Sequence, residues 1–509
     1  MIKNLEQEKV FLPVPENDRK KTRSVMVLLY SFAALFVVMF TLKSIQIHEI
    51  FGTSAYDLGI FDQGFWLISR FENAFNTVRG IHTLGDHFSP IVYIFTPFYW
   101  LSPSINWAFF FQPISVGLGA IALFHIGRSL FPGQLLIPFI FSISYLMNPV
   151  VHNTLLWQYH NLVLASCLYM FLILFYIKNQ FAKYLITLFL LLCCREDMPF
   201  TLAMIGFVEL WQRKWRFAAC TILFSILWWL TVTNFVMPYF NGTGYFRYEV
   251  GKVGALTSHI FDLAYYIKRF WVENDARLYL WQVFMPLGFL SLLSPLYLIP
   301  ALPTMFANTM IGSYNTQIAY HYSVSVVPFV YISAMISFKF LNDKAKKMFH
   351  RHYTSFFLLA VILGLTLYAN VNYSKLHPDK IISIYQSWIR MSDLRKDVND
   401  FRSSINEKIG VSASDYLVPH LSHRKHIYLF PNPWQIHYWG MKGEKPHHPN
   451  KVQYIVIDPS QYSNHYRLIS YLVNKGYFKE IKKTSRLIVY KRLRDENPDK
   501  ERILKEMRE

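Results

Sequence analysis

Acidic residues and histidines occur together in short polar segments between the apolar stretches of this sequence. The segment from Tyr56 to Gln63 contains Asp57 and Asp62, and Asp86-His87 follows it. The remaining segments hold His160, the run Arg195-Glu196-Asp197, and His321. Carboxylates with one or two histidines form a hard ligand set that suits Mg²⁺, Mn²⁺ or Ca²⁺ more than zinc. A carboxylate can also take a proton from a hydroxyl group. The segments therefore predict a metal site or an acid-base site.

Each segment also has a purely structural interpretation. Asp57 and Asp62 are five residues apart and do not share a helical face, so they could be solvated acids on a surface helix. Asp86-His87 could cap a helix, because an apolar segment follows it. The Arg-Glu-Asp run could be a solvated turn, and the two later histidines could lie at a membrane interface. A shared location of all these residues would favour a functional site.

The elements that must position these residues are membrane helices. Of the 509 residues, 53% are hydrophobic and only 16% are charged, against roughly 25% in soluble domains. Several apolar runs reach the roughly 17 to 25 residues needed to cross a bilayer, so we expect a polytopic α-helical membrane protein with about eleven transmembrane helices. The expected spans are 25–42, 104–126, 134–151, 160–177, 181–194, 198–212, 217–237, 281–294, 295–311, 317–338 and 353–371.

The basic residues predict the orientation of the chain. Arg19, Lys20, Lys21 and Arg23 precede the first apolar run, and no small-residue cleavage site follows it. Residues 1–24 are therefore expected as a cytoplasmic tail before an uncleaved first span. Eleven crossings place the loop 43–103, all the segments above and residues 372–509 outside the cell membrane. The transmembrane domain then covers residues 25–371.

Two proline-containing segments depart from simple spans. Pro286, Pro295, Pro300 and Pro303 could break the helices expected at 281–311 or make them re-entrant. The stretch 90–103 is short and aromatic, so we expect it along the outer membrane interface, where Trp and Tyr are common.

Residues 372–509 have the composition of a soluble domain. Apolar residues recur every three or four positions over 381–405, which predicts an amphipathic helix. Short β-type runs follow at 410–413, 426–430, 452–457 and 486–490, separated by Pro, Asn and Gly. We therefore predict a small extracytoplasmic α/β domain.

Composition and motifs exclude several classes of function. The four cysteines lie within apolar runs, which is unsuited to a disulfide framework or a thiolate metal site. Nucleotide-binding motifs are absent, so no nucleotide cofactor is expected. The formal charge of +19 gathers at helix ends and in the C-terminal third, where membrane lipid rather than nucleic acid is the expected partner.

Taken together, the polar segments resemble those of the DUF2079 family of predicted bacterial and archaeal membrane proteins. The resemblance covers about residues 25–490, and its most specific motifs are 56–63 and 86–90. The others are Tyr159-His160, Arg195-Glu196-Asp197, His321-Tyr322 and the stretch 416–424. The family in turn resembles GT-C glycosyltransferases, multi-pass enzymes that take a sugar from a polyprenyl phosphate.

This resemblance implies a role for each candidate residue. Asp57 would be the catalytic base that activates an acceptor hydroxyl for inverting transfer, although Leu58 and Gly59 replace the second acid of the usual GT-C pair. Glu196 and Asp197 would bind a divalent cation. Substrate or phosphate would contact Asp86, His87, His160, Arg195 and His321. The long loop offers further phosphate ligands or solvated residues in Arg247, Lys252, Lys268 and Arg269.

We therefore expect a glycosyltransferase that uses a polyprenyl-phosphate-linked sugar and an unknown outer-face acceptor. A lipid-linked sugar transporter or flippase is the first alternative, but transport would require polar residues in mid-span, and the early spans are almost free of charge. A non-catalytic membrane assembly protein is the second, and it predicts dispersed rather than convergent acids and histidines.

Overall fold

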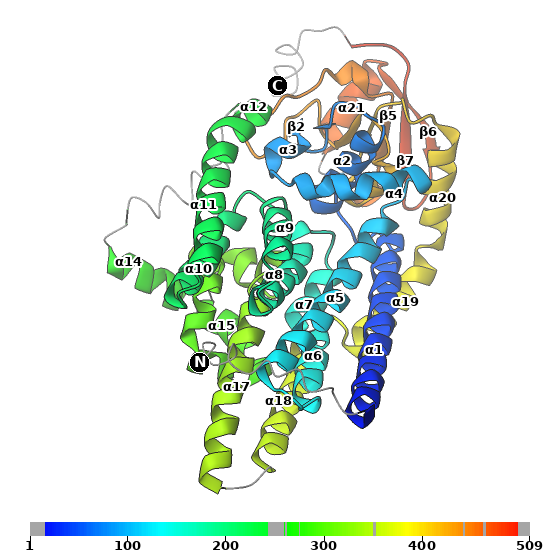
Figure 1. Cartoon of the computed structure of the whole chain (residues 1–509). Coiled ribbons are helices and arrows are strands. Elements are labelled where there is room, and N and C mark those ends of the chain that lie inside the picture. Colours follow the sequence, from blue (N-terminus) through cyan, green and yellow to red (C-terminus); the bar gives the residue numbers. More distant parts are fainter. Residues whose placement is uncertain are drawn as a thin grey trace.

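The computed structural model of the protein describes residues 16–242, 259, 262–273, 275–349, 353–440, 443–461 and 465–496. Figure 1 shows a large helical bundle with a small sheet domain at one end of it. The segments that carry the candidate residues lie where the bundle meets the sheet domain, so the fold brings distant parts of the sequence to one level.

Four helical segments within the described residues are long and apolar enough to cross a membrane, judged by length and composition. They are Arg19–Glu49, Asn106–Leu130, Trp215–Asn241 and Ser355–Tyr373. The first lies in α1 (Glu16–Glu49) and the second is α5. The third joins α11 (Trp215–Thr231), η4 (Val232–Val236) and α12 (Met237–Asn241), and the fourth lies in α18 (Tyr353–Tyr373). The remaining spans of the predicted eleven stay predictions.

Shorter apolar helices fill the bundle between these four. The runs expected at 160–177, 181–194 and 198–212 are α8 (Asn161–Ile177), α9 (Phe181–Leu192) and α10 (Met198–Trp211). The run expected at 134–151 is divided into α6 (Leu136–Leu146) and α7 (Pro149–Leu155). Asn148 separates them, because its side-chain oxygen accepts a bond from the Val150 N–H and caps the second helix. The run expected at 317–338 is helical from Val327 to Phe349 as α17.

The proline-rich segment 281–311 is broken into short pieces, in accord with its sequence. It comprises α15 (Ala276–Phe284), η7 (Met285–Leu287), η8 (Leu290–Leu293), η9 (Pro295–Ala301) and α16 (Leu302–Ile311). Hydroxyl groups of the neighbouring helices bond to the carbonyls that the breaks leave free. Ser333 of α17 donates to the Ser291 and Ser294 carbonyls, and Thr366 of α18 donates to the Pro286 carbonyl. The irregular backbone is thus satisfied inside the bundle.

The loop after α1 folds into short elements beside the sheet domain. They are η2 (Ala55–Gly59), α2 (Ile60–Ser69), β1 (Phe75–Asn76), β2 (Ile81–His82), α3 (Thr83–Asp86), η3 (Pro90–Phe95) and α4 (Thr96–Leu101). Asp86 is the last residue of α3 and does not cap the next helix, so the capping interpretation of Asp86-His87 is wrong.

The C-terminal region forms the predicted α/β arrangement. The single helix expected over 381–405 is two helices, α19 (Pro378–Arg390) and α20 (Ser392–Ser404). The sheet has the order β4-β3-β5-β7-β6, with the first three strands parallel and the last two antiparallel to their neighbours. Its elements are β3 (Val411–Ala413), η12 (Asp415–Leu421), β4 (Ile427–Leu429), β5 (Tyr454–Ile457), α21 (Tyr466–Asn474), β6 (Phe478–Lys483) and β7 (Ile488–Arg492).

Sequence reasoning predicted four of these strands and missed β6. Its sequence, FKEIKK, is mostly charged and lacks the apolar alternation of a half-buried strand. Such charges are common on edge strands, where they oppose pairing with another chain.

The sheet domain shares its hydrophobic core with the loop after α1. Phe51, Ala55 and Ile60 of the loop belong to one buried cluster with residues of the C-terminal region. Those residues include Leu394, Val398, Val411, Leu417, Val418 and Leu421. The sheet domain and the loop are therefore a single packing unit.

The contact between α5 and α6 generates a prediction about stability. A Cβ added at Gly127 would lie 2.5 Å from Pro138 Cβ and 3.1 Å from its Cα, whereas a Cβ at Gly364 of α18 would meet nothing within 4 Å. Alanine favours a helix at both positions equally, so their comparison isolates the steric effect. We expect Gly127→Ala to be less stable than Gly364→Ala by about 1–3 kcal/mol. Thermal unfolding of both variants in detergent measures this, and equal midpoints would contradict the close contact.

Candidate functional site

Asp57 lies in a turn, residues 54–58, whose backbone is held from two directions. The side-chain oxygen of Gln158 accepts bonds from the Ser54 N–H (3.2 Å) and the Leu58 N–H (3.0 Å). Asp415 of the sheet domain accepts a bond from the Ala55 N–H (2.8 Å). With these contacts the Asp57 backbone adopts φ 73° and ψ −91°. Non-glycine residues rarely adopt such values, and when they do they often belong to functional sites.

The turn brings Asp57 to two histidines from separate parts of the chain. His160 directly precedes α8, and His321 lies in η11 (His321–Ser323). The His160 Nε2 is 3.2 Å from Asp57 Oδ1, and the two imidazoles stack with their ring centres 3.2 Å apart. One ligand atom from each of the three residues lies within 4.8 Å of the others. Asp57, His160 and His321, the triad hereafter, therefore form a candidate metal-binding group.

Electrostatics keep Asp57 ionised although it is largely enclosed. Burial opposes ionisation, but the charge and hydrogen bond of His160 and the Trp157 Nε1–H, 3.1 Å from Oδ2, lower the pKa of Asp57 below its ordinary value. Burial, together with the electrostatic influence of His160, Arg195 and His87, lowers the pKa of His321 far below its ordinary value. Its buried Nδ1 has no hydrogen-bond partner among the described residues. The ionised carboxylate of Asp57 thus lies close to the neutral imidazole of His321, whose Nδ1 is available as a ligand atom.

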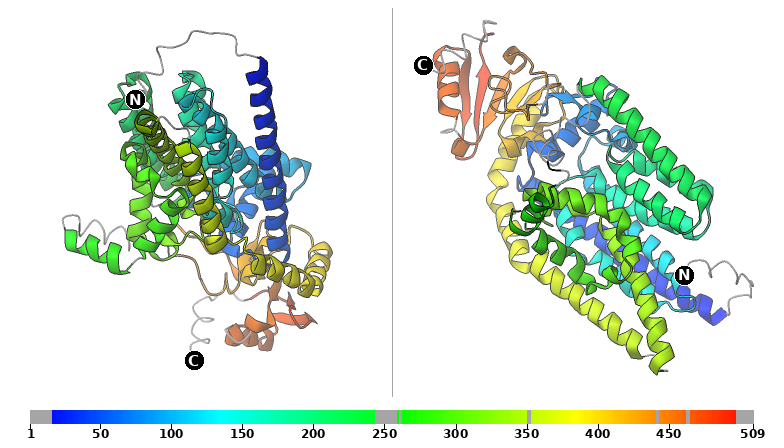
Figure 2. Two further views of the ribbon diagram at one scale, coloured as in Figure 1. Left: turned by 90° about the horizontal axis from the view of Figure 1, so that it is seen from below. Right: turned by 90° about the vertical axis from the view of Figure 1, so that its left-hand side faces the viewer.

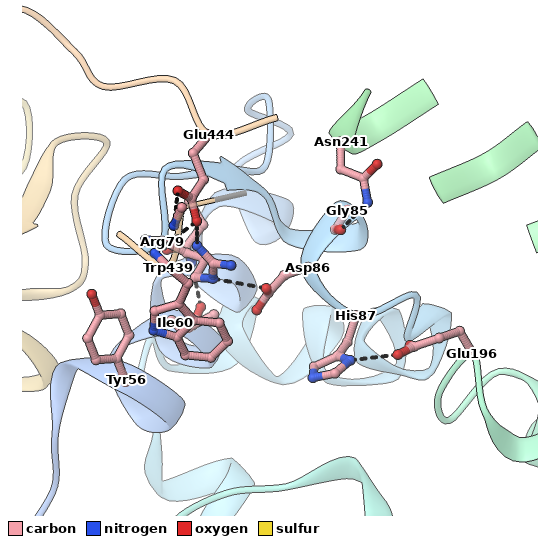
Figure 3. Close-up of polar contacts among 12 residues, drawn as sticks. Tyr56, Ile60, Arg79, Gly85, Asp86, His87, Glu196, Asn241, Trp439 and Glu444 are labelled. Carbon is pink, nitrogen blue, oxygen red and sulfur yellow. Dashed lines mark hydrogen bonds and ion pairs between the residues drawn. The ribbon is translucent and has the colours of Figure 1, made fainter. Parts of the chain in front are cut away.

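Two ion pairs flank the triad. His87 Nδ1 donates to Glu196 Oε1 (2.8 Å), and the Phe88 N–H donates to Glu196 Oε2 (3.0 Å), as Figure 3 shows for the first bond. Arg195 pairs with Asp197 through Nε at 2.6 Å. Both carboxylates expected as metal ligands are thus already engaged in ion pairs, and their role in metal binding stays a prediction.

Arg79 is a site residue that sequence reasoning missed. Its side chain is fully buried, its Nε donates to Asp86 Oδ1 at 3.0 Å, and it also pairs with Glu444. The ring of Trp439 covers its guanidinium at 4.2 Å (Figure 3). A single arginine in a polar loop gives no sequence signal of burial. Only the fold shows that Asp86 is held by this residue.

Asp62 is buried, so its interpretation as a solvated surface acid is wrong. Its side chain is 2% exposed. Oδ1 accepts bonds from Tyr99 (2.6 Å) and His423 (3.0 Å), and Oδ2 accepts a bond from Ser422. Ser422 and His423 belong to the 416–424 motif, so Asp62 connects the first and last of the characteristic motifs.

The basic residues of the long loop divide into two groups. Arg247 and Lys252 lie outside the described residues. Lys268 pairs with Glu273 at 3.2 Å, and Arg269 donates to the Met310 carbonyl at 2.8 Å. Lys268 and Arg269 are thus engaged in local contacts.

A family model matches residues 47–489 and describes predicted membrane proteins, DUF2079. The chain belongs to this family. The match covers every motif that carried the sequence resemblance. No protein of curated function matches the sequence.

Solved structures resemble this DUF2079 protein in fold. ArnT from Cupriavidus metallidurans bound to undecaprenyl phosphate has a TM-score of 0.54 at 9% identity, over 90% of this chain and 98% of that chain. The apo form of the same ArnT gives 0.51 at 11% identity, over 92% and 98%. An oligosaccharyltransferase of Archaeoglobus fulgidus with Zn and sulfate gives 0.40 at 13% identity, over 87% and 71%. The expected likeness to GT-C glycosyltransferases is thereby confirmed at the level of fold.

The pair of His87 and Glu196 generates a prediction about pH. Burial opposes the charge on His87, but Glu196 raises the pKa of His87 to about 9. The pair therefore stabilises the fold fully below the ordinary pKa of 6.5, and this contribution is lost as the pH rises through about 9. We expect His87→Gln to lower the thermal midpoint of unfolding at pH 6.5. Above pH 9 the midpoint of this variant should approach that of the native protein.

The control for this experiment is His377→Gln. His377 lies 3.2 Å from Asp379, but this pair is open to solvent, with side chains 41% and 84% exposed. Exposed ion pairs contribute little to stability, so its midpoint should follow the native curve. A pH-independent deficit in His87→Gln would show that packing rather than charge accounts for the effect.

Proposed function

We propose that this protein is a multi-pass membrane glycosyltransferase that moves a sugar from a polyprenyl phosphate to an acceptor hydroxyl on the outer face of the cell membrane. The observation that carries this proposal is the triad. It places an ionised carboxylate in a fixed turn beside two imidazoles, at the junction of bundle, loop and sheet domain. An assembly protein requires no such convergence. The fold shared with ArnT, solved with undecaprenyl phosphate, agrees with a lipid-phosphate donor.

In the proposed reaction, Asp57 accepts the proton of the acceptor hydroxyl group. At the same time the oxygen of that hydroxyl group forms a bond to the anomeric carbon of the sugar. The bond between that carbon and the phosphate oxygen breaks, and polyprenyl phosphate leaves with the electron pair, so the sugar inverts. The Asp57 side chain is 30% exposed, which leaves room for an acceptor to reach it. Oδ2 accepts one bond from Trp157 and has further acceptor capacity.

Positive groups beside the triad are suited to the phosphate of the donor. His87 is protonated at neutral pH, and it is near enough to lower the pKa of Asp57. Arg195 is near enough to act on His321. Both residues could contact phosphate oxygens, on which negative charge increases as the sugar leaves. Asp86, expected among the phosphate ligands, would act through Arg79, to which it is bonded.

The triad also defines the cation that the site would hold. Mg²⁺ and Ca²⁺ prefer oxygen ligands alone, so two imidazoles and one carboxylate would rather hold a transition metal ion, of which Mn²⁺ also accepts carboxylates. Zinc accepts the same donors, so the absence of thiols does not exclude it. When bound, such an ion would supply positive charge for the phosphate. Asp57 Oδ1, next to His160, is the oxygen available to it.

The proposed topology places the triad outside. The N-terminus is cytoplasmic, the chain crosses about eleven times, and the sheet domain is extracytoplasmic. The positive-inside distribution of Lys and Arg supports this arrangement.

Asp57→Asn tests the proposed base. The amide keeps the shape of the carboxylate but cannot take a proton, and loss of a general base typically lowers a rate by about 10²–10⁴. We expect sugar transfer from radiolabelled polyprenyl-phosphate sugars, measured in membranes at matched expression, to fall by that factor. Asp379→Asn, an exposed acid of α19, is the matched control and should transfer like the native protein. Equal rates of sugar transfer by Asp57→Asn and by the native protein would eliminate Asp57 as the base. Movement of the donor lipid across the membrane without any sugar transfer would favour a flippase.

His321→Gln tests the cation. In the full-length protein stripped of metal by a chelator, added Mn²⁺ should raise the thermal midpoint, because binding to the folded state stabilises it. Replacement of one of three ligands should reduce this shift strongly, while His377→Gln should retain it. If His321→Gln and the native protein respond equally to Mn²⁺, the triad is not the metal site.

A further inference from the structure

A polar cavity separate from the triad has Asp62 of α2 in its wall. It has a volume of about 390 Å³. It is enclosed by the end of α1, the segment before α5, the helix α20 and the motif in η12. None of the three triad residues lines it. Whatever this cavity binds is therefore distinct from the ligands of the proposed transfer reaction.

Positively charged and histidine side chains dominate the wall of this cavity. Arg395 and Arg402 belong to α20, and His48, His420 and His423 also line the cavity. Arg402 is exposed and has no ion pair with any residue within the described ranges. The ring of His420 stacks on His48 with centres 4.0 Å apart. Its buried Nε2 lacks a hydrogen-bond partner in the described part of the chain.

Neither acid of the wall pairs with Arg402. Asp62 accepts bonds from Tyr99, Ser422 and His423. Glu49 lies 3.9 Å from Arg395, at the limit of an ion pair. Arg402 thus has no carboxylate partner among the described residues, in a cavity large enough for several heavy atoms. Arginine beside histidine and asparagine donors is the combination that recognises a phosphate.

The surroundings of the cavity indicate a phosphate attached to a lipid. The long apolar helix α1 ends at Glu49, which lines the cavity. The neighbouring α19 contacts α1, lies beside it in Figure 1 and departs from the direction of α18 in Figure 2. Large apolar side chains of α19 are exposed, namely Ile382, Tyr385, Trp388 and Ile389. An amphipathic helix with such a face lies in the membrane interface, at the depth of lipid phosphates.

Arg395 connects this interfacial helix to the cavity. It donates to the Trp388 carbonyl at 2.6 Å, and its guanidinium stacks on the Trp388 ring at 4.4 Å. Trp100 and Leu101 are also exposed, two and three positions before Pro103 of the cavity wall. Exposed apolar and aromatic groups thus occur both in α19 and in the segment before α5.

We propose that this cavity binds the phosphate of a membrane phospholipid, with Arg402 and Arg395 as its cationic ligands and the acyl chains against α19. The lipid comes from the leaflet that meets the C-terminal end of α1. This site is independent of the sugar-transfer proposal, because it uses no residue of the triad.

Native mass spectrometry of the full-length protein with phosphatidylglycerol tests this site. After delipidation and titration, we expect one lipid to be retained more tightly than the rest. Arg402→Gln with Arg395→Gln should weaken its retention about tenfold or more, since each charged hydrogen bond to a phosphate contributes substantially. Asn106→Trp should have the same effect without removing a charge, because it fills the cavity from its wall. The control is Arg390→Gln, an exposed arginine of α19 outside the wall, which should retain the lipid.

Each other outcome would overturn the proposal. Equal loss in Arg390→Gln would indicate unspecific adsorption to basic surface. Competition by inorganic phosphate or glycerol phosphate at the same concentration would show that the cavity takes a free phosphate and not a lipid. Unchanged retention in both the arginine and the Asn106→Trp variants, with native thermal midpoints, would place the bound lipid elsewhere.

Discussion

The turn of residues 54–58 is the constraint on which the candidate site depends. Its backbone N–H groups would be unsatisfied on burial, and two remote side chains accept from them, Gln158 from the bundle and Asp415 from the sheet domain. Buried hydrogen bonds of this kind are costly to break, because each leaves a donor without a partner. They hold Asp57 in a conformation that the chain would otherwise rarely adopt.

The same constraint explains why the loop after α1 and the sheet domain pack as one unit. Gly59 follows the turn so closely that a Cβ there would lie 3.1 Å from Val418 of η12. Gln63 extends the contact, since its amide donates to the Arg424 carbonyl at 3.2 Å and to Thr77 at 2.8 Å. Packing and hydrogen bonding thus continue from the turn into α2, and the orientation of Asp57 follows from the position of the whole sheet domain.

The sequence predicted helices and strands better than the contacts between side chains. Apolar runs and turn residues located most helices and four strands, because periodicity is a local property. It also selected Asp57, His160 and His321, since polar residues inside apolar surroundings require a reason. It could not foresee that Glu196 pairs with His87 or that Asp62 is buried against Ser422, because these contacts join segments 109 and 360 positions apart. Arg79 and Asp86 are only seven positions apart, but a single arginine in a polar loop gives no sequence signal of burial. The sequence also gave no sign that Gln158 accepts the backbone hydrogen bonds of the turn.

The bond between Ala55 and Asp415 joins residues 360 positions apart, and this separation has a consequence for biosynthesis. A growing chain inserts its first helix long before Asp415 is translated, so the turn lacks this acceptor during most of synthesis. The site can assemble only after the sheet domain has emerged and docked on the first loop. A prematurely terminated or proteolysed chain without the sheet domain would therefore lack one of the two supports of this turn.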